Sequence, residues 1–575
     1  MPRLADGFSE RRGGPRLCKM ATQDILRLRR NAGQLHALTS VEREIRANDP
    51  TVGRKYLRHF HDAYRSYEKV LATAQVRSAM AEAGIVLVAD YHALPNSQRF
   101  LASSIRDPEL CRRPIVLGLE TIFARDQHIV DEWFRGEIEE DEFRQRIRYD
   151  LDWGYDWAPF YELLVAAREL GEGIYGLDCM PREDLRKIGA RDRHAADKIA
   201  EIRARHSGAL VLVLFGESHL APRHLPTQVR QRLPEERIVT VLQNVDALYW
   251  RSAGEAADRV EAVRVRDDVF CVFNATPLEK YENYRLCLDR WGRADRAPDL
   301  GPTVFNLIDG LVRFLGIDRY SAHNTNQPRL LVDLMPEVYS NGSDALLRRL
   351  LSRKGFSAGQ RRSMLRRIRE RGSAYLAPLN VVYVKQFQMM TVAEDAARFL
   401  HHACRGLPSR VNGMMPEMPR PEDAFYSTVL ENAFACFGSR VLYPARPAFR
   451  DADLDELYDL TREDLEHQTS LSYSDAVEAL DFLVWHRQSD RHVETGLAPS
   501  RARHAGPDWT RVLAFTGRRS EYITEQLGNL VGNDLYDAYL EGRFTPAAMR
   551  KLFLAHVEEP GIARQTYATL NARLR

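Results

Sequence analysis

The chain has 575 residues, which is too long for one ordinary hydrophobic core and predicts two or three domains. The charges of its 82 basic and 80 acidic residues nearly cancel. Apolar residues make up 44% of the chain, but they form no run of the roughly 20 residues that a membrane helix needs. This composition is typical of globular proteins, so we expect no transmembrane segment and no nucleic-acid partner.

The first 30 residues are rich in arginine and lack the apolar core of a secretory signal, which predicts a disordered leader over residues 1–30. Cys18 follows no apolar run, so it does not resemble the lipidated cysteine of a lipoprotein. The seven cysteines include no C-x-x-C pair, which suits a reducing compartment. We therefore expect a cytoplasmic location.

The first half of the chain contains near-continuous apolar runs of strand length, separated in most cases by helical patterns. The runs are residues 84–90, 114–120, 173–178, 209–216, 237–244 and 267–274. Strands that are apolar on both faces are typical of a parallel sheet covered by helices on both sides. We therefore predict an α/β domain over residues 31–293, with a mainly parallel β-sheet flanked by helices.

The second half of the chain has a different pattern, which is mostly helical. Residues 294–305 indicate a linker, and residues 306–575 form a mostly helical C-terminal region whose role the sequence does not reveal. Thr391 and Glu394 predict a capping box at a helix start. The basic run at 359–372 is interpreted as the solvated face of a helix.

Polar side chains follow the apolar runs of the first half. They are Asp90, His92, Glu120, Asp178, Glu217, His219, Asn244 and Asn274. The carboxyl ends of parallel strands meet at one edge of a sheet, where ligands bind, so we expect these groups to converge. Asp178 and Asn274 are interpreted as helix caps. Glu120 ends a fully apolar strand and therefore needs a partner.

Two kinds of chemistry fit these groups. Mixed imidazole and carboxylate donors suit Fe, Zn or Mn, and a histidine oriented by a carboxylate is a general base. Residues 216–220 also suggest the G-x-S-x-G nucleophile elbow with Ser218 as nucleophile, but Leu220 stands where the second glycine is required, which disfavours that reading.

Five blocks of the first half resemble a known family. They are "VLVADYHALPNSQ", "VLGLETIFARDQHIVDEWFRGEIEEDEF", "WGYDWAPFYELLVAARELGEGIYGLD", "RDRHAADKIAEI" and "LVLFGESHL". Their order and spacing are similar to those of the ChaN-like domain of the haem-binding uptake/Tiki superfamily. Its wider relatives include erythromycin esterases and TraB/Tiki proteins. The resemblance covers roughly residues 60–290 and implies the fold predicted above.

The resemblance also implies site residues. The family's first block is usually G-E-x-H, whereas this chain has Ala89-Asp90-Tyr91-His92, although Gln98 keeps a later glutamine. The residues implied as catalytic are His92, His219 and Glu120. Those implied as metal ligands are Asp90, His92, Glu120 and His219. Those implied as cofactor contacts are Asp90, Tyr91 and Glu217, with Tyr155 and Tyr161 as further haem-facing candidates.

Three hypotheses follow. The first is a ChaN-like protein that binds haem, an iron compound or a divalent metal (Fe, Zn or Mn) at the strand ends. The second is a hydrolase of the erythromycin-esterase/Tiki type that cleaves an ester or peptide bond, with or without a metal. The third is an interaction scaffold that uses the helical half. We expect a small-molecule ligand or haem as the partner, and the sequence leaves open both a homodimer and whether the chain is an enzyme.

Overall fold

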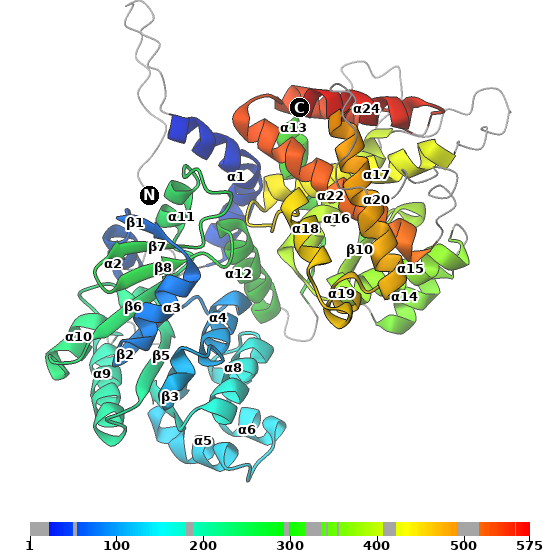
Figure 1. Cartoon of the computed structure of the whole chain (residues 1–575). Coiled ribbons are helices and arrows are strands. Elements are labelled where there is room, and N and C mark those ends of the chain that lie inside the picture. Colours follow the sequence, from blue (N-terminus) through cyan, green and yellow to red (C-terminus); the bar gives the residue numbers. More distant parts are fainter. Residues whose placement is uncertain are drawn as a thin grey trace, which may run out of the picture.

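The computed structural model describes residues 22–49, 55–179, 188–292, 298–317, 335–340, 343–352, 356–405, 421–492, 517–557 and 559–574. An α/β domain occupies the lower left of Figure 1, and a mostly helical half lies at the upper right. Cys18, most of the predicted leader and residues 294–297 of the predicted linker lie outside the described residues. The α/β fold class and the helical character of the C-terminal region are confirmed.

The α/β domain is built on an eight-stranded sheet with the order β1-β7-β8-β6-β2-β5-β3-β4. Its strands are β1 (Lys69–Leu71), β2 (Ile85–Asp90), β3 (Ile115–Phe123), β4 (Gly173–Asp178), β5 (Leu210–Gly216), β6 (Ile238–Gln243), β7 (Ala262–Arg266) and β8 (Val269–Val272). The strands from β8 to β4 are parallel, whereas β7 is antiparallel to both β1 and β8.

All six predicted strands are present in the sheet. The sequence missed β1 and β7, because these short strands at one edge of the sheet are partly exposed and carry charged residues rather than apolar runs. The alternation of side chains along β2 shows why the inner strands are apolar throughout. Val86 and Val88 face one core of the domain, and Ile85 and Leu87 face the other.

Helices cover both faces of the sheet. One face packs against α3 (Thr73–Ala81), α4 (Pro95–Ile105), α5 (Gln127–Phe134), α6 (Glu140–Arg146), α7 (Tyr149–Asp152) and α8 (Trp157–Leu170). The other face packs against α2 (Lys55–Ala63), α9 (Ile188–Arg205), α10 (Leu225–Arg232) and α11 (Asp246–Ser252). The sheet is therefore enclosed, and its polar strand ends are the part of it available for chemistry.

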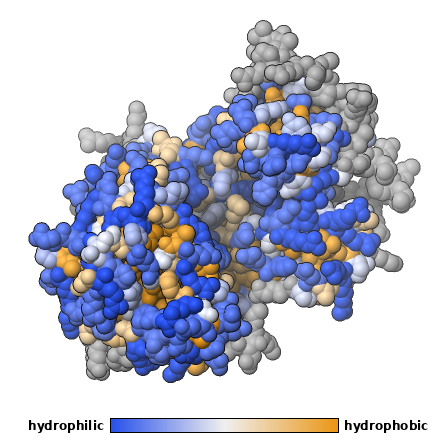
Figure 2. All heavy atoms as spheres, turned by 60° about the horizontal axis from the view of Figure 1, so that its bottom comes forward, coloured by the Kyte–Doolittle hydropathy of each residue, from blue (hydrophilic) through white to orange (hydrophobic). Residues whose placement is uncertain are grey.

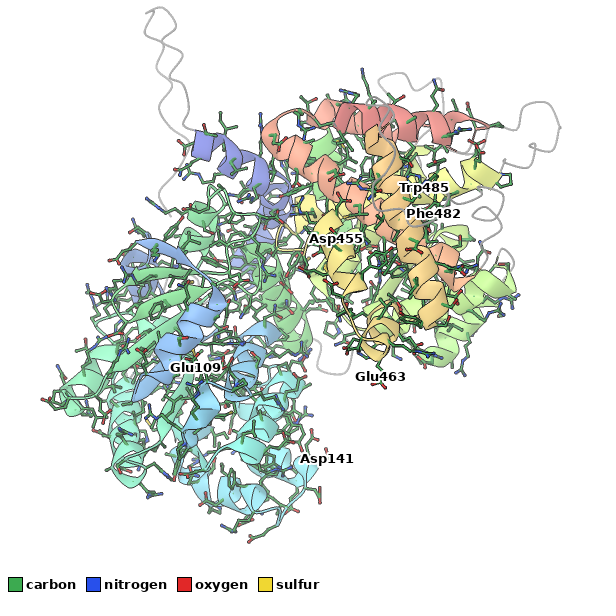
Figure 3. The ribbon with its side chains drawn as sticks, in the orientation of Figure 1. Glu109, Asp141, Asp455, Glu463, Phe482 and Trp485 are labelled. Carbon is green, nitrogen blue, oxygen red and sulfur yellow. The ribbon has the colours of Figure 1, made fainter. Side chains whose placement is uncertain are left out.

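The helical half has its own large hydrophobic core. Its helices are α13 (Gly301–Leu315), α16 (Met389–Arg405), α17 (Pro421–Leu442), α18 (Asp451–Tyr458), α19 (Arg462–Thr469), α20 (Tyr473–His492), α22 (Arg518–Glu541), α23 (Pro546–Phe553) and α24 (Ile562–Leu574). Figure 3 shows Phe482 and Trp485 on α20, and Glu463 at the lower margin on α19. The rings of Phe482 and Trp485 lie 5.9 Å apart, as expected for side chains that fill this core.

A smaller unit belongs to this half. It consists of α14 (Asp344–Leu351), α15 (Ala358–Arg371) and a three-stranded sheet of β9 (Glu337–Ser340), β10 (Ser373–Leu376) and β11 (Val381–Val384). Strand β11 pairs with β10 in antiparallel and with β9 in parallel orientation. Leu347, Ile368 and Val381 belong to a separate hydrophobic core that these elements share.

Two predicted boundaries are wrong. Residues 22–30, placed in the predicted leader, form the start of helix α1 (Thr22–Asn48), and α13 begins at Gly301, inside the predicted linker. Helix α1 contacts α12 (Pro277–Gly292), α13, α17 and α22, so it joins the core of the helical half. The stabilising partners of α1 lie hundreds of residues away, which is why its own sequence did not reveal it.

The surface of the molecule is largely hydrophilic, with scattered apolar patches and a hollow between the two lobes (Figure 2). Among the described helices, none combines the length and the apolar character needed to cross a bilayer.

Candidate functional site

Glu120 is the centre of a polar cluster at the carboxyl edge of the sheet. It lies in β3 and is only 4% exposed. Arg191 of α9 donates to its Oε1 at 2.6 Å, and the backbone N–H of Gly216 donates to its Oε2 at 2.5 Å. A Cβ atom at position 216 would lie 2.9 Å from Glu120 Oε2, so the close approach of strand and carboxylate requires glycine. Glu120 is thus held from two neighbouring elements.

His92 reaches the same carboxylate from the end of β2. Its Nε2 lies 3.9 Å from Glu120 Oε2, and its Nδ1 lies 2.8 Å from Asp90 Oδ2. Gln98 of α4 donates to the other oxygen of Asp90. The His92 side chain is 21% exposed, whereas Asp90 is buried, so Asp90 fixes the orientation of an imidazole that reaches the surface.

His219 approaches Glu120 from the opposite side. It lies in the short 3-10 helix η4 (Glu217–Leu220) that follows β5, and its Nε2 is 3.8 Å from Glu120 Oε1. Its Nδ1 lies 2.5 Å from Asp192 Oδ1, and the Tyr56 hydroxyl donates to Asp192 Oδ2 at 2.9 Å. Two imidazoles, each backed by an aspartate, therefore converge on one carboxylate.

The chain of polar contacts continues from Asp192 toward the surface. His224 stacks on the ring of Tyr56 with their centroids 3.7 Å apart, and its Nε2 lies 3.2 Å from His59 Nδ1. Burial, together with the neighbouring His59 and His219, lowers the pKa of His224 to about 4. His224 is therefore neutral at physiological pH.

The two carboxylates in the centre have opposite pKa shifts. Burial alone would raise the pKa of Glu120, but His219, Arg191, His92 and the Gly216 N–H lower it to about 2. Burial raises the pKa of Asp90 in spite of the hydrogen bonds from His92 and Gln98. Glu120 is thus ionised at physiological pH, whereas burial opposes the ionisation of Asp90.

The structure brings together the four residues that the sequence placed at this site: Asp90, His92, Glu120 and His219. It adds Arg191 and Asp192, which the sequence did not assign. Arg191 makes a two-pronged ion pair with Asp178 at 2.9 Å in addition to its contact with Glu120. Residues 180–187, where a helix capped by Asp178 would begin, lie outside the described residues, so the cap stays a prediction. Arg191 and Asp192 open the block "RDRHAADKIAEI", which was the one available signal.

Glu217 and Tyr91, the predicted cofactor contacts beside Asp90, belong to a neighbouring cluster. The buried Lys280 donates to both oxygens of Glu217 at 3.1 and 3.2 Å, and its ammonium lies 4.4 Å from the centre of the Tyr91 ring. Asp246 lies 3.8 Å from the same ammonium. In this structure Glu217 therefore neutralises a buried lysine.

Aromatic rings surround the exposed edge of His92. The centroids of Trp153 and Tyr155 lie 4.5 and 5.3 Å from its ring, and Tyr155 lies 5.1 Å from Trp291, which is 42% exposed. Tyr161, the other tyrosine named from the sequence, stacks on Trp157 in the helical layer instead. The partly exposed His92 therefore lies beside a row of rings that includes Tyr155 but not Tyr161.

The predicted metal set is not confirmed. In the part of the chain that the structure describes, no group of three or more His, Cys, Asp or Glu side chains is arranged to hold a metal ion. The carboxylates explain this result, because Glu120 points at Arg191 and Gly216 while Asp90 points at His92 and Gln98. The Ser218 side chain, the rejected nucleophile, makes no hydrogen bond to either histidine among these residues.

Comparisons with known proteins agree with the resemblance drawn from the sequence. Residues 76–201 match the model of the family described as haem-binding uptake, Tiki superfamily, ChaN. A solved structure described as cofacial heme binding to ChaN of Campylobacter jejuni is 15% identical and covers 31% of this chain and 87% of its own, with a TM-score of 0.25. No curated protein matches the chain. The family-model match confirms the ChaN-like resemblance for residues 76–201, from α3 to α9.

Proposed function

We propose that this protein binds haem at the carboxyl edge of its sheet. The premise is that residues 76–201 form a ChaN-like domain of the haem-binding uptake type. The observation that carries the proposal is the row of aromatic rings beside the partly exposed His92. Trp153, Tyr155 and Trp291 are the rings of this row.

The residues present fit a flat, iron-containing ligand. Aromatic rings stack on a macrocycle, and histidine is a common axial ligand of haem iron. A ligating histidine usually has its second ring nitrogen bonded to a carboxylate, as Asp90 is bonded to His92. Burial raises the pKa of Tyr155 far above its usual range, so a phenolate ligand at this position is disfavoured. Bound haem would supply the iron, and the protein would supply the stacking surface and the oriented imidazole.

The test is a haemin titration of the full chain, followed by the Soret band. We expect a saturable spectral change that His92→Ala and Trp291→Ala each weaken by about tenfold or more. His128→Ala is the matched control, because His128 is an exposed histidine of α5 outside the cluster. The absence of a saturable change in the wild-type protein, or an equal loss in the control, would refute the proposal.

A second candidate function has its own observation. Two aspartate–histidine pairs converge on Glu120 from opposite sides, with their Nε2 atoms 3.9 and 3.8 Å from its carboxylate. In such a pair the aspartate orients the imidazole and stabilises its protonated form, which suits general acid–base catalysis. The arrangement therefore supports a hydrolase that activates water at one histidine and protonates a leaving group at the other.

This second function predicts turnover of an ester or amide substrate from a panel, measured without added metal. We expect His219→Ala to reduce turnover by about 10²- to 10⁴-fold with the fold intact by circular dichroism. Asp192→Asn should produce a smaller loss and shift the pH–rate profile, because Asp192 acts through His219. Equal turnover by wild-type protein and His219→Ala would eliminate this candidate.

A further inference from the structure

The unit formed by α14, α15 and the small sheet lies at the outer edge of the helical half, on the side away from the α/β domain (Figure 1). Along the chain its order is helix, short connection, second helix and then the hairpin of β10 and β11. Helix α14 ends at Leu351, and α15 begins at Ala358. This order is that of a helix–turn–helix followed by a β-hairpin, in which the second helix is the one that enters the DNA major groove.

The arginines of α15 are divided between two faces. On the inner face, Arg366 pairs with Glu521, while Arg367 and Arg371 pair with the buried Glu394 at 2.9 and 3.1 Å. On the outer face, Arg361, Arg362 and Arg369 are exposed. The inner arginines therefore hold α15 on the protein, and the outer ones point to solvent.

The outer arginines make no ion pair within the part of the chain that the structure describes, and the acidic residue near Arg348 and Arg369, Asp344, is itself paired with Lys385. No ion pair within the described residues involves Arg361, Arg362 or Arg369, or the exposed Arg348 and Arg349 of α14. The acidic residues of the two helices are already engaged, Asp344 with Lys385 at 2.9 Å and Glu370 with Arg518 at 3.6 Å. Five arginines thus face one exposed carboxylate that already pairs with Lys385, so the face carries an excess of positive charge.

The position of two of these arginines is unfavourable for the isolated helix. Arg361 and Arg362 lie in the first turns of α15, which carry no acidic residue, and the helix begins at the capped Ser357. The positive end of the helix dipole repels cations at that position and attracts anions. An anionic partner placed there would remove the repulsion and bond to the exposed N–H groups of the first turn.

We propose that this arginine face, formed by Arg348, Arg349, Arg361, Arg362 and Arg369, binds double-stranded DNA, with α15 directed into the major groove. The near-zero charge of the whole chain hides this local patch, and this is why composition led to the opposite expectation. Phosphates of the DNA backbone supply the charge that the patch lacks, and arginine is well suited to bind them. This activity is independent of the haem or hydrolase site in the other lobe.

The experiment measures binding of the full chain to a fluorescein-labelled 30-base-pair duplex by fluorescence anisotropy at salt concentrations from 50 to 200 mM. The test variant is Arg361→Gln/Arg362→Gln/Arg369→Gln. The control variant Arg43→Gln/Arg58→Gln/Arg112→Gln removes the same charge from exposed arginines outside the patch. Circular dichroism confirms that both variants are folded.

We expect the test variant to lose at least about tenfold in affinity and to lower the slope of log affinity against log salt by about 3, since three phosphate contacts disappear. The control variant should bind like the wild-type protein. The proposal fails if wild-type protein does not bind the duplex at 50 mM salt, or if both variants lose affinity equally. It also fails if the patch binds vesicles containing phosphatidylserine but not DNA.

Discussion

Two buried glutamates, Glu120 in the α/β domain and Glu394 in the helical half, are surrounded by cationic side chains in different ways. Glu120 meets one arginine, one backbone N–H and two histidines. Glu394 meets four arginines, and both carboxylates have pKa values below their ordinary value. Arginine keeps its proton at all physiological pH values, whereas histidine exchanges it near neutrality.

The cluster around Glu394 is therefore a structural hub. Arg367 and Arg371 of α15, Arg398 of α16 and Arg446 after α17 all donate to its carboxylate at 2.7 to 3.1 Å. One carboxylate thus fastens three segments of the helical half. Glu120 is held in place by Arg191 and the Gly216 N–H, and its two remaining neighbours are histidines, which can exchange protons. Both carboxylates are buried, so the two clusters differ in the identity of their cationic neighbours, which are arginines alone around Glu394 and histidines beside one arginine around Glu120.

The largest effect should follow from removing the hub. Glu394→Gln leaves four partly or fully buried arginines without their common anion, and we expect a loss of about 3–5 kcal/mol in the free energy of unfolding. Urea denaturation followed by circular dichroism measures it. Glu463→Gln, at an exposed position of α19 (Figure 3), is the control and should change stability by less than about 0.5 kcal/mol. A loss below about 1 kcal/mol for Glu394→Gln would contradict the structural role.

A smaller, pH-dependent effect is expected at Glu120. Its folded pKa of about 2 lies below its ordinary value of 4.5, so its ionised form stabilises the fold above pH 4.5, and this contribution is lost as the pH falls toward 2. The contribution is at most about 3 kcal/mol. Glu120→Gln should therefore lower the Tm at pH 7 and flatten its decline below pH 4.5. Parallel Tm–pH curves for the two proteins would show that the carboxylate contributes nothing.

Asp90→Asn should separate stability from ligand binding. The substitution preserves shape but removes the carboxylate that orients His92, so we expect a loss of about 1 kcal/mol in stability and about tenfold in haemin affinity. Asp395→Asn is the matched control in the hub, where the carboxylate accepts from the Ser373 hydroxyl and the Tyr375 N–H. It should cost similar stability and leave haemin affinity unchanged. If both variants lose haemin equally, Asp90 has no particular role.

The smallest effect is expected at Ser218→Ala. The residue lies between Glu217 and His219, yet its hydroxyl contacts neither histidine among the described groups. Stability should change by less than about 0.5 kcal/mol, and haemin binding or hydrolysis should be unaffected. A loss of turnover beyond about tenfold would revive the nucleophile-elbow interpretation.

The fold and the strand-end residues of the site were predictable for the same reason. Fully apolar strands that end in Asp90, Glu120 and Glu217 are a pattern of consecutive residues, and parallel strands bring such ends together. Arg191 was not predictable in this way, because it lies inside a helix and its role depends on where α9 packs. Glu217 shares the strand-end pattern but serves Lys280, which is 63 residues away.

Glu394 is a second residue whose role could not be predicted from its neighbours in the sequence. With Thr391 it fits the spacing of a capping box, yet α16 begins at Met389 and the glutamate gathers arginines from α15, α16 and the segment after α17. A threonine followed three residues later by a glutamate also occurs where no capping box forms. The role of a buried carboxylate such as Glu394 can therefore be assigned only when its distant partners are known.

Helix α1 has a consequence for synthesis of the chain. Ala37 packs against Gly310 of α13, and Arg29 bonds to Leu540 and Tyr539 near the other end of the polypeptide. At about 5–20 residues per second, the ribosome needs roughly 15–50 s to deliver α13 after α1 has emerged. During that interval α1 can already pack against α12 and residues 253–257, so the α/β lobe would carry α1 in place before the helical half is made.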